Sequence, residues 1–214
     1  MKIFFASIAL FTALVSCAQK EIKKTEIPVG IKKSSGAKEA VATFAQGCFW
    51  HTEIVFQSLD GVRDAVSGFA GGTVKNPDYE TVCTGKTGHA ESVQVYYNPD
   101  KISYATLVKA FFASHDPTQL NRQGNDVGNH YRSVAFYNNA GEKQIIEAEI
   151  KRLNDTKIFE KNIVTQVSPV NKFYPAEAYH QEYILNNPSN GYVRNVSIPD
   201  FIHFKKTFKG NFKQ

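Results

Sequence analysis

The stretch that decides the fold runs from Val41 to Asp60 and reads VATFAQGCFWHTEIVFQSLD. Its first residues are apolar or β-branched and predict a buried strand that ends at Gly47. The apolar residues that follow recur at helical spacing, at Trp50, Ile54, Val55 and Leu59. They predict a helix from Cys48 onward. The order of strand, glycine and helix places Cys48 at a helix amino terminus, where partial positive charge favours a thiolate.

Short strand-like and helical segments alternate through the rest of the chain without repeats. Further strands are expected at 89–97, 132–137 and 163–167, with helices after Ser103, over 141–153 and from Pro175. Glycine-rich turns are expected at 68–72 and 84–88, and the carboxyl end from Asn190 is expected to wrap on the surface without a regular period. Strands mixed with helices favour an α/β sandwich.

The amino terminus is typical of an export signal. An apolar stretch from Ile3 to Val15 follows Lys2 and is too short to span a bilayer. The next residues, Leu14-Val15-Ser16-Cys17, resemble a bacterial lipobox, which implies cleavage and lipidation at Cys17. We therefore expect a signal peptide over 1–16 and an anchored, lysine-rich tether over 17–39, with the mature protein in the periplasm or outside the cell.

Composition excludes several classes of function. The chain has 214 residues, is 42% hydrophobic and carries a formal net charge of +5. Much of the positive charge lies in the tether without interleaved aromatic residues, so we expect no nucleic-acid partner. No Cys-x-x-Cys or paired histidine and cysteine spacing suggests a metal site. A monomeric catalytic domain over 40–195 with a carboxyl-terminal tail over 196–214 is the expected organisation.

Two cysteines remain for chemistry once Cys17 carries the lipid. Cys48 and Cys83 would share an oxidising compartment, where a structural disulfide is the plain alternative. Glu91 is in phase with the apolar residues Val93 and Val95, so it should point into the apolar side of its strand. Burial would raise its pKa and keep it protonated. A neutral acid beside a nucleophilic thiol suits attack on a centre whose leaving oxygen needs a proton.

Three long motifs in order resemble the peptide methionine sulfoxide reductase A family. They are Gly47-Cys48-Phe49-Trp50, the run from Tyr79 to Glu91 (YETVCTGKTGHAE), and Gly124-Asn125-Asp126-Val127-Gly128 through Tyr131-Arg132-Ser133. Tyr174-Pro175-Ala176-Glu177 and Tyr179-His180-Gln181 are similar too, and the resemblance spans roughly residues 40–193. It implies an α+β two-layer sandwich with a mixed sheet and a plait-like, ferredoxin-like core.

The resemblance also implies a role for each site residue and selectivity for the S epimer. Cys48 would attack the sulfoxide sulfur and become a sulfenic acid while Glu91 protonates the oxygen. The remaining implied site residues are the oxygen-binding Tyr79 and Tyr131, the organising Asp126, and the pocket residues Phe49 and Trp50. Methionine sulfoxide, free or in proteins, is the implied substrate, and no metal or organic cofactor is needed.

Two departures from the family pattern bear on how the enzyme is reset. No cysteine follows Cys83, so the tail lacks the resolving cysteines of many relatives. Cys83 is expected to be structural, with a resolving role as the alternative, and an external thiol or thioredoxin-like protein is the expected reductant. The pair Asn129 and His130 also departs from the family pattern, and His130 is expected to face solvent, with a role in tuning the site as the alternative.

Two other functions remain open from the residues alone. A cysteine hydrolase would need His89, His130 or His180 beside Cys48, with Asp126 orienting the imidazole. A non-enzymatic lipoprotein would instead be held by a disulfide between Cys48 and Cys83. The first predicts an imidazole within hydrogen-bond reach of the Cys48 sulfur, and the second predicts no free thiol.

Overall fold

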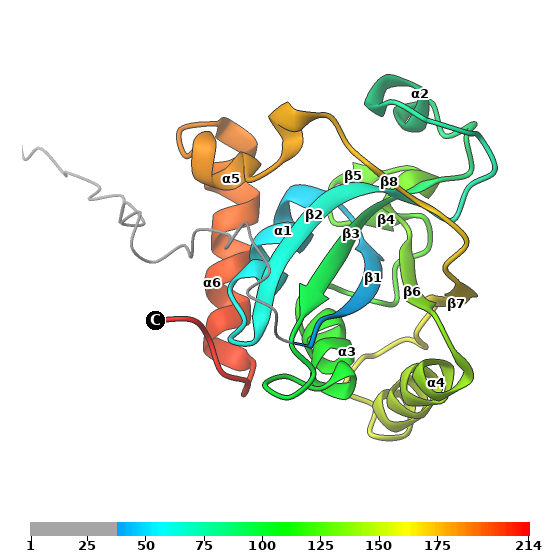
Figure 1. Cartoon of the computed structure of the whole chain (residues 1–214), viewed down its shortest axis with the longest axis vertical. Helices are drawn as coiled ribbons and strands as arrows, with labels where there is room; N and C mark the ends of the chain where they lie inside the picture. The colour runs from blue at the N-terminus through cyan, green and yellow to red at the C-terminus, as the bar shows by residue number, and fades with distance from the viewer. Residues whose placement is uncertain (1–37) are drawn as a thin grey trace, which may run out of the picture.

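The computed structural model describes residues 38–214, so the expected signal peptide, Cys17 and nearly all of the tether lie outside the described residues. One six-stranded sheet has the order β7-β6-β1-β3-β2-β8 (Figure 1). Its strands are β1 (Ala40–Gln46), β2 (Val62–Ala70), β3 (Ala90–Tyr97), β6 (Ser133–Tyr137), β7 (Gln166–Pro169) and β8 (Phe173–Pro175). Two short strands, β4 (Arg122–Gln123) and β5 (Asp126–Val127), form a separate hairpin.

Within residues 38–214, six α-helices connect or follow these strands. They are α1 (Phe49–Gln57), α2 (Tyr79–Cys83), α3 (Tyr104–Ala113), α4 (Ala140–Asp155), α5 (Tyr183–Asn186) and α6 (Ile198–Thr207). Short 3-10 helices lie at Asn129–Tyr131 and Ala178–His180, and a π-helical turn lies at Val193–Ser197.

The centre of the sheet is built from two interleaved strand-helix-strand units. The unit β1-α1-β2 leaves a gap that β3 fills, and β6 returns after α3 to lie beside β1. This is the split arrangement of a ferredoxin-like plait. Neighbouring strands are antiparallel except for β6 and β7, which are parallel. The predicted α+β sandwich with a mixed sheet and plait-like core is confirmed.

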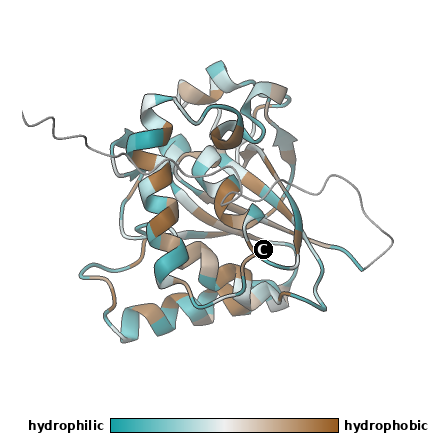
Figure 2. Ribbon diagram, turned by 90° about the vertical axis from the view of Figure 1, so that its left-hand side faces the viewer, coloured by the Kyte–Doolittle hydropathy of each residue, from teal (hydrophilic) through white to brown (hydrophobic). Residues whose placement is uncertain are grey.

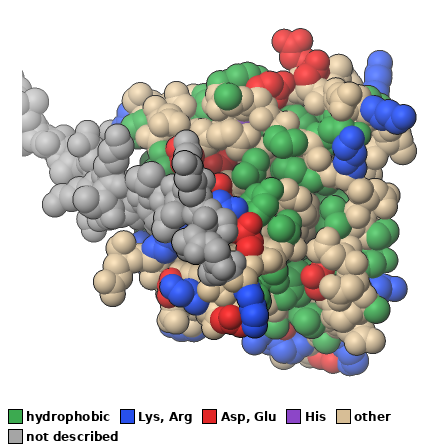
Figure 3. Space-filling model, viewed as in Figure 1, with side chains coloured by type: hydrophobic (Ala, Val, Ile, Leu, Met, Phe, Trp, Pro, Cys, Tyr) green, Lys and Arg blue, Asp and Glu red, His purple; other side chains and the backbone are tan. Residues whose placement is uncertain are grey.

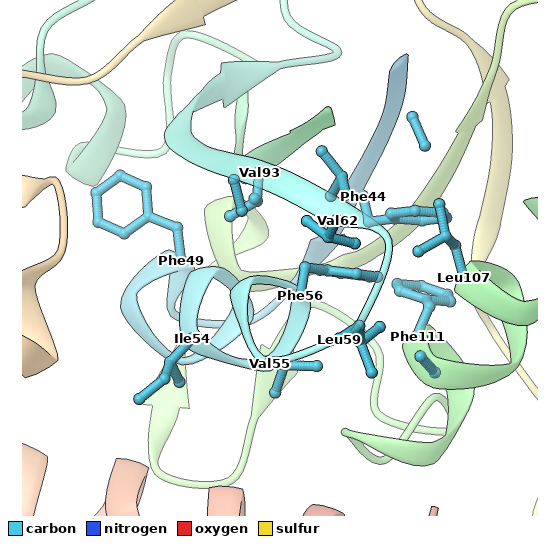
Figure 4. Close-up of a cluster of buried hydrophobic side chains, with 14 of the residues drawn as sticks. Phe44, Phe49, Ile54, Val55, Phe56, Leu59, Val62, Val93, Leu107 and Phe111 are labelled. Atoms are coloured by element: carbon cyan, nitrogen blue, oxygen red, sulfur yellow. The ribbon is translucent and has the colours of Figure 1, made fainter. Parts of the chain in front are cut away.

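Helices α1 and α3 pack against the sheet, with α6 outside α1 and α4 beside β6 and β7 (Figure 1). Three phenylalanine rings join the layers, because the Phe44 ring of β1 stacks on Phe56 of α1 at 5.0 Å and on Phe111 of α3 at 5.2 Å (Figure 4). Such offset stacking adds to the free energy of burial. The outer helices alternate apolar and polar residues (Figure 2), and charged side chains are spread among hydrophobic ones on the face seen in Figure 3.

Two expected elements are wrong at the edge of the sheet. Residues 68–70 belong to β2 rather than to a turn, and Pro175 ends β8 rather than starting a helix. These segments pair with each other, Gly68 lying opposite Pro175. A Cβ on Gly68 would lie 2.3 Å from the Tyr174 carbonyl oxygen, so the glycine permits close approach of β8 and marks no turn.

The expectation of an irregular carboxyl end is also wrong. Residues 198–207 form α6, which buries Phe201 and Phe204 against the core, and its aromatic neighbours at 208–212 pack onto the same cluster. The tail is thus part of the domain rather than a cover on it. Among residues 38–214, no helix has the length and apolarity needed to cross a bilayer.

Candidate active site

Cys48 lies where the chain turns from β1 into α1, as its sequence context predicts. It occupies the cap position of α1, and Gly47 before it has a φ of 94°, a conformation that favours glycine. A Cβ on Gly47 would also lie 2.6 Å from the Cβ of Gln123, so the turn leaves no room for a side chain. The backbone N–H groups of Trp50 and His51 point at the thiol and lower its pKa.

The resting thiol is nevertheless not the thiolate that its helix position suggests. Burial raises the pKa of Cys48 well above its ordinary value, the charge of Glu91 raises it further, and these effects outweigh the helix N–H groups. The expected low pKa is therefore wrong for the free protein. Cys48 holds its proton at neutral pH.

Glu91 lies where its phase in the strand predicts. It is 1% exposed, and its Oε2 accepts a hydrogen bond of 3.0 Å from the Phe49 N–H in the first turn of α1. This bond ties the carboxyl to the residue after Cys48. Burial raises the pKa of Glu91 to about 8, and the charge of Asp126 raises it while the Phe49 bond lowers it. The site thus places a neutral acid beside the thiol at pH 7.

Asp126 approaches the site from the β4–β5 hairpin. Its Oδ2 accepts a hydrogen bond of 2.5 Å from the Tyr192 hydroxyl, and the same tyrosine also interacts with the Cys48 side chain. Burial together with the nearby charges of Cys48 and Asp126 raises the pKa of Tyr192, so the phenol remains a donor. No sequence motif predicts Tyr192, which lies in an aromatic-rich segment without a clear period.

Tyr79 and Tyr131 come to the same site from α2 and from the 3-10 helix before β6. Both are partly buried, and burial followed by the charge of Glu91 raises the pKa of each phenol. The Tyr79 hydroxyl also hydrogen-bonds Cys83, at the end of its own helix. Two protonated phenols thus lie near Glu91 and Cys48.

Aromatic rings form a wall beside Cys48, which we call the aromatic wall: Phe49, Trp50, Tyr79 and His180. The Phe49 ring lies 4.9 Å from His180 and 6.2 Å from Tyr79. Trp50 is fixed on both sides, because its Nε1 donates to His180 Nδ1 at 3.0 Å and its ring stacks on Tyr183 at 3.7 Å. His180 is 1% exposed and belongs to the aromatic wall through its contacts with Phe49 and Trp50. The motif Tyr179-His180-Gln181 does not by itself predict these contacts.

The two alternative functions find no support in this geometry. Cys48 and Cys83 are both free thiols, which is incompatible with the disulfide. Within residues 38–214, no histidine ring hydrogen-bonds the Cys48 sulfur. The same residues contain no group of three or more histidine, cysteine, aspartate or glutamate side chains that could hold a metal ion.

His130 is buried, not solvent-facing as expected. It is 7% exposed, and its ring lies 4.1 Å from the Tyr131 ring. The ring is accommodated because Gly128 has no side chain, since a Cβ there would lie 2.5 Å from His130 Cε1. Burial lowers the pKa of His130, so it supports Tyr131 as a neutral ring.

Comparisons with known proteins agree with this site. The family model for peptide methionine sulfoxide reductase matches residues 40–212. The peptide methionine sulfoxide reductase MsrA of Deinococcus radiodurans is 51% identical over 164 residues, covering 77% of this chain and 80% of the relative. The MsrA of Nautilia profundicola is 48% identical, covering 80% of this chain and 98% of the relative.

Solved structures of similar proteins share this fold. Mxr1 from Saccharomyces cerevisiae in reduced form superimposes with a TM-score of 0.68 at 35% identity, covering 74% of this chain and 91% of that one. Methionine sulfoxide reductase A of Corynebacterium diphtheriae gives 0.67 at 29% identity, covering 80% and 92%. The match to the family model extends through α6, in keeping with the place of this helix in the core. This chain belongs to the peptide methionine sulfoxide reductase A family.

Proposed function

We propose that this chain reduces the S epimer of methionine sulfoxide, free or in proteins, through a sulfenic acid on Cys48. Its family membership makes it an oxidoreductase that repairs oxidised methionine with electrons from a thiol and without a prosthetic group. The observation that carries the mechanism is the hydrogen bond from the Phe49 N–H, which holds the protonated Glu91 beside the Cys48 thiol.

The first half-reaction takes one proton from Glu91 and one electron pair from the Cys48 sulfur. The Cys48 sulfur attacks the sulfoxide sulfur as a thiolate, and Glu91 protonates the oxygen. The oxygen passes to Cys48 as the sulfur–oxygen bond of the substrate breaks, which leaves methionine and a Cys48 sulfenic acid. The carboxylate of Glu91 then regains the proton that the thiol lost, so the atoms balance.

The other site residues would bind the substrate around this centre. Tyr79 and Tyr131 would donate to the sulfoxide oxygen, where charge develops during attack. Phe49 and Trp50 would hold the substrate methyl group, since they present apolar surface beside the thiol. Asp126 would hold Tyr192 against Cys48 through the hydrogen bond described above.

An external thiol or a thioredoxin-like protein would reduce the sulfenic acid. The sequence has no cysteine after Cys83, and Cys83 hydrogen-bonds Tyr79 in α2 and forms no bond with Cys48. We therefore assign Cys83 a structural role. We also propose that the enzyme acts as a monomer.

The epimer and the nucleophile can be tested together. Purified protein with dithiothreitol should reduce the S epimer and leave the R epimer, Cys48→Ser should be inactive, and Cys83→Ser should retain activity. Reduction of neither epimer, or full activity in Cys48→Ser, would refute the mechanism. If Cys83→Ser loses turnover only when the reductant is a protein, Cys83 is instead the resolving residue.

The location of the protein rests on its amino terminus. We propose export and a lipid anchor at Cys17 that faces the periplasm or the cell exterior, because residues 1–17 combine an h-region with a lipobox. Labelled fatty acid should enter the wild-type protein and co-sediment with membranes, whereas Cys17→Ala should not be labelled. Equal labelling of the two proteins would contradict the anchor.

A further inference from the structure

A cavity beside Cys48 extends beyond the residues used in the reaction described above. It is a cavity of about 290 Å³ whose lining includes Cys48, Asp126 and Tyr192. Neither the aromatic wall nor Glu91 nor Tyr131 lines it. The cavity lies between β1, the β4–β5 hairpin and the start of α6, whereas Glu91 contacts the residue after Cys48 through the Phe49 N–H.

Buried polar atoms without partners line this cavity. Gln46 and Ser197 are each 1% exposed, and neither Gln46 Oε1 nor Ser197 Oγ has a hydrogen-bond partner. Gln46 is held in place because its Nε2 donates to Ser114 Oγ at 2.8 Å. A buried acceptor without a donor is costly, so these atoms indicate that a ligand or water supplies one.

His51 adds a buried ring to the same lining. It is 9% exposed, and its Nε2 lies 3.2 Å from the Ser114 carbonyl oxygen. Burial lowers the pKa of His51, which keeps the ring neutral, although the charge of Asp200 and the backbone of Ser114 and Ser197 raise it.

The charge of the cavity has one sign. Asp126 and Asp200 line it, and no lysine or arginine does. Its other titratable rings are neutral, because burial lowers the pKa of His115 to about 4 as it does that of His51. Unpaired acceptors and two carboxylates together favour a small ligand with a cationic N–H donor.

The position of the cavity indicates which reaction such a ligand serves. The oxygen that Cys48 receives comes from the side of Glu91, which protonates it. A thiol that displaces this oxygen must approach the sulfur roughly in line with the bond that breaks, and hence from another side. We propose that the cavity binds the small thiol that reduces the Cys48 sulfenic acid, and that it selects thiols bearing an ammonium group.

The proposal rests on the proposed function, since it concerns the second half of the same reaction. The thiol sulfur attacks Cys48, a mixed disulfide forms, and the hydroxyl leaves as water with the proton of the thiol. A second molecule of the thiol then attacks the bound thiol sulfur, which releases the small disulfide and restores the Cys48 thiol.

A route from solvent to the cavity is present. Ser114, His115, Gln123 and Asp200 line both the cavity and a wider groove of about 880 Å³ over α3, α4 and α6. Asp200 is exposed where the two spaces meet, and it can attract a cation at the entrance. A cavity of this size is large enough for a small thiol.

Three thiols of similar size and different charge test the selectivity. The sulfenic acid is formed first by one turnover with methionine sulfoxide, and the rate of its reduction is then measured with 2-aminoethanethiol, 2-mercaptoethanol and 3-mercaptopropionate. The same rates are measured in Asp200→Asn and in a control, Asp100→Asn, which removes an exposed carboxylate outside the cavity lining.

We expect Asp200→Asn to lower the rate ratio of aminoethanethiol to mercaptoethanol by about two- to fivefold, the effect of one partly screened ion pair. The same change should raise the relative rate of mercaptopropionate, and Asp100→Asn should alter neither ratio. Ratios compared between variants cancel the intrinsic reactivity of each thiol. Added salt should weaken the preference of the wild type, a second measurement that needs no variant.

Unchanged ratios in Asp200→Asn, or a wild-type ratio that ignores salt, would overturn the proposal while leaving the proposed function intact. A higher KM for sulfoxide peptide in Asp200→Asn with unchanged thiol rates would place the substrate in the cavity and also overturn it. Failure to release methionine in the first turnover would refute the proposed function itself, whichever thiol is used.

Discussion

Cys48 and Glu91 act as one titrating pair, because the charge of Glu91 raises the pKa of the thiol. The pair holds two protons below the Glu91 pKa of about 8 and must lose one to become a thiolate beside a neutral acid. We therefore predict that kcat/KM for the first half-reaction rises with pH and levels near pH 8. Stopped-flow rates between pH 6 and 9 check this, and a rate that falls from pH 6 to 8 would contradict it.

Replacing Glu91 by glutamine tests whether the reaction needs the proton of this residue or only its buried side chain. Glu91→Gln keeps the shape of the side chain but cannot give a proton, so the first half-reaction should slow by roughly 10²- to 10⁴-fold. Glu53→Gln is the matched control, because Glu53 is another buried acid, on α1, whose partners are Ser67, Gln57 and the Glu182 backbone. Its single-turnover rate should stay within about twofold of the wild type, whereas equal losses in both variants would point to a general packing effect.

Tyr192 offers a test at a residue that the sequence did not indicate. Tyr192→Phe keeps the ring but leaves Asp126 without its donor, and a lost hydrogen bond to a charged group costs about 1.5–3 kcal/mol. We predict a roughly tenfold or greater fall in kcat with a smaller change in KM, measured with sulfoxide at saturating thiol. An unchanged kcat would show that Asp126 is held without Tyr192.

The residues predicted from sequence share one property, which is that local pattern fixes them. Cys48 follows a strand and a glycine, and Glu91 lies in phase with the apolar face of its own strand. Tyr192 and His180 reach the site through contacts with residues distant in sequence, such as hydrogen bonds to Asp126 and Trp50, which are 66 and 130 residues away. No local period encodes such contacts, so the fold is needed to find them.

At the level of elements, the turn from β1 into α1 is the part that positions the nucleophile. Gly47→Ala would force a side chain into a positive φ and against Gln123, so we predict a loss of about 1–3 kcal/mol in unfolding free energy and slower methionine release. Gly191→Ala is the control, because nothing lies within 4 Å of a Cβ there. Urea denaturation compares the two, and equal stabilities would contradict the role of Gly47.

Elements with strong periods were predicted well, and those shaped by long-range packing were not. The helix after Ser103 begins at Tyr104, where the Ser103 side chain accepts from the Thr106 N–H as a cap. Gly68 resembles a turn residue in the sequence, but a glycine is needed there because strand β8, which is distant in sequence, packs directly against it. The sequence does not predict helix α6, because its buried positions, Phe201 and Phe204, form too short an apolar stripe to show a helical period.

At the scale of the whole molecule, buried acids make stability depend on pH. Burial raises the pKa of Glu53 from 4.5 to about 7. Between these values the unfolded chain loses the proton and the folded chain keeps it, so folding stability falls as pH rises through this window. We predict that Glu53→Gln gains roughly 1–3 kcal/mol relative to the wild type between pH 4.5 and 7.5, measured as the difference of their unfolding free energies. A pH-independent difference would show that Glu53 is ionised in the fold.

One turnover should oxidise Cys48 to a sulfenic acid. Purified protein without any thiol is mixed with the S epimer of methionine sulfoxide and then with dimedone, which labels sulfenic acids. We expect about one methionine released per chain and a dimedone adduct on the peptide that carries Cys48, in the wild type and in Cys83→Ser but not in Cys48→Ser. Methionine release without an adduct at Cys48, or an adduct on Cys83 alone, would contradict it.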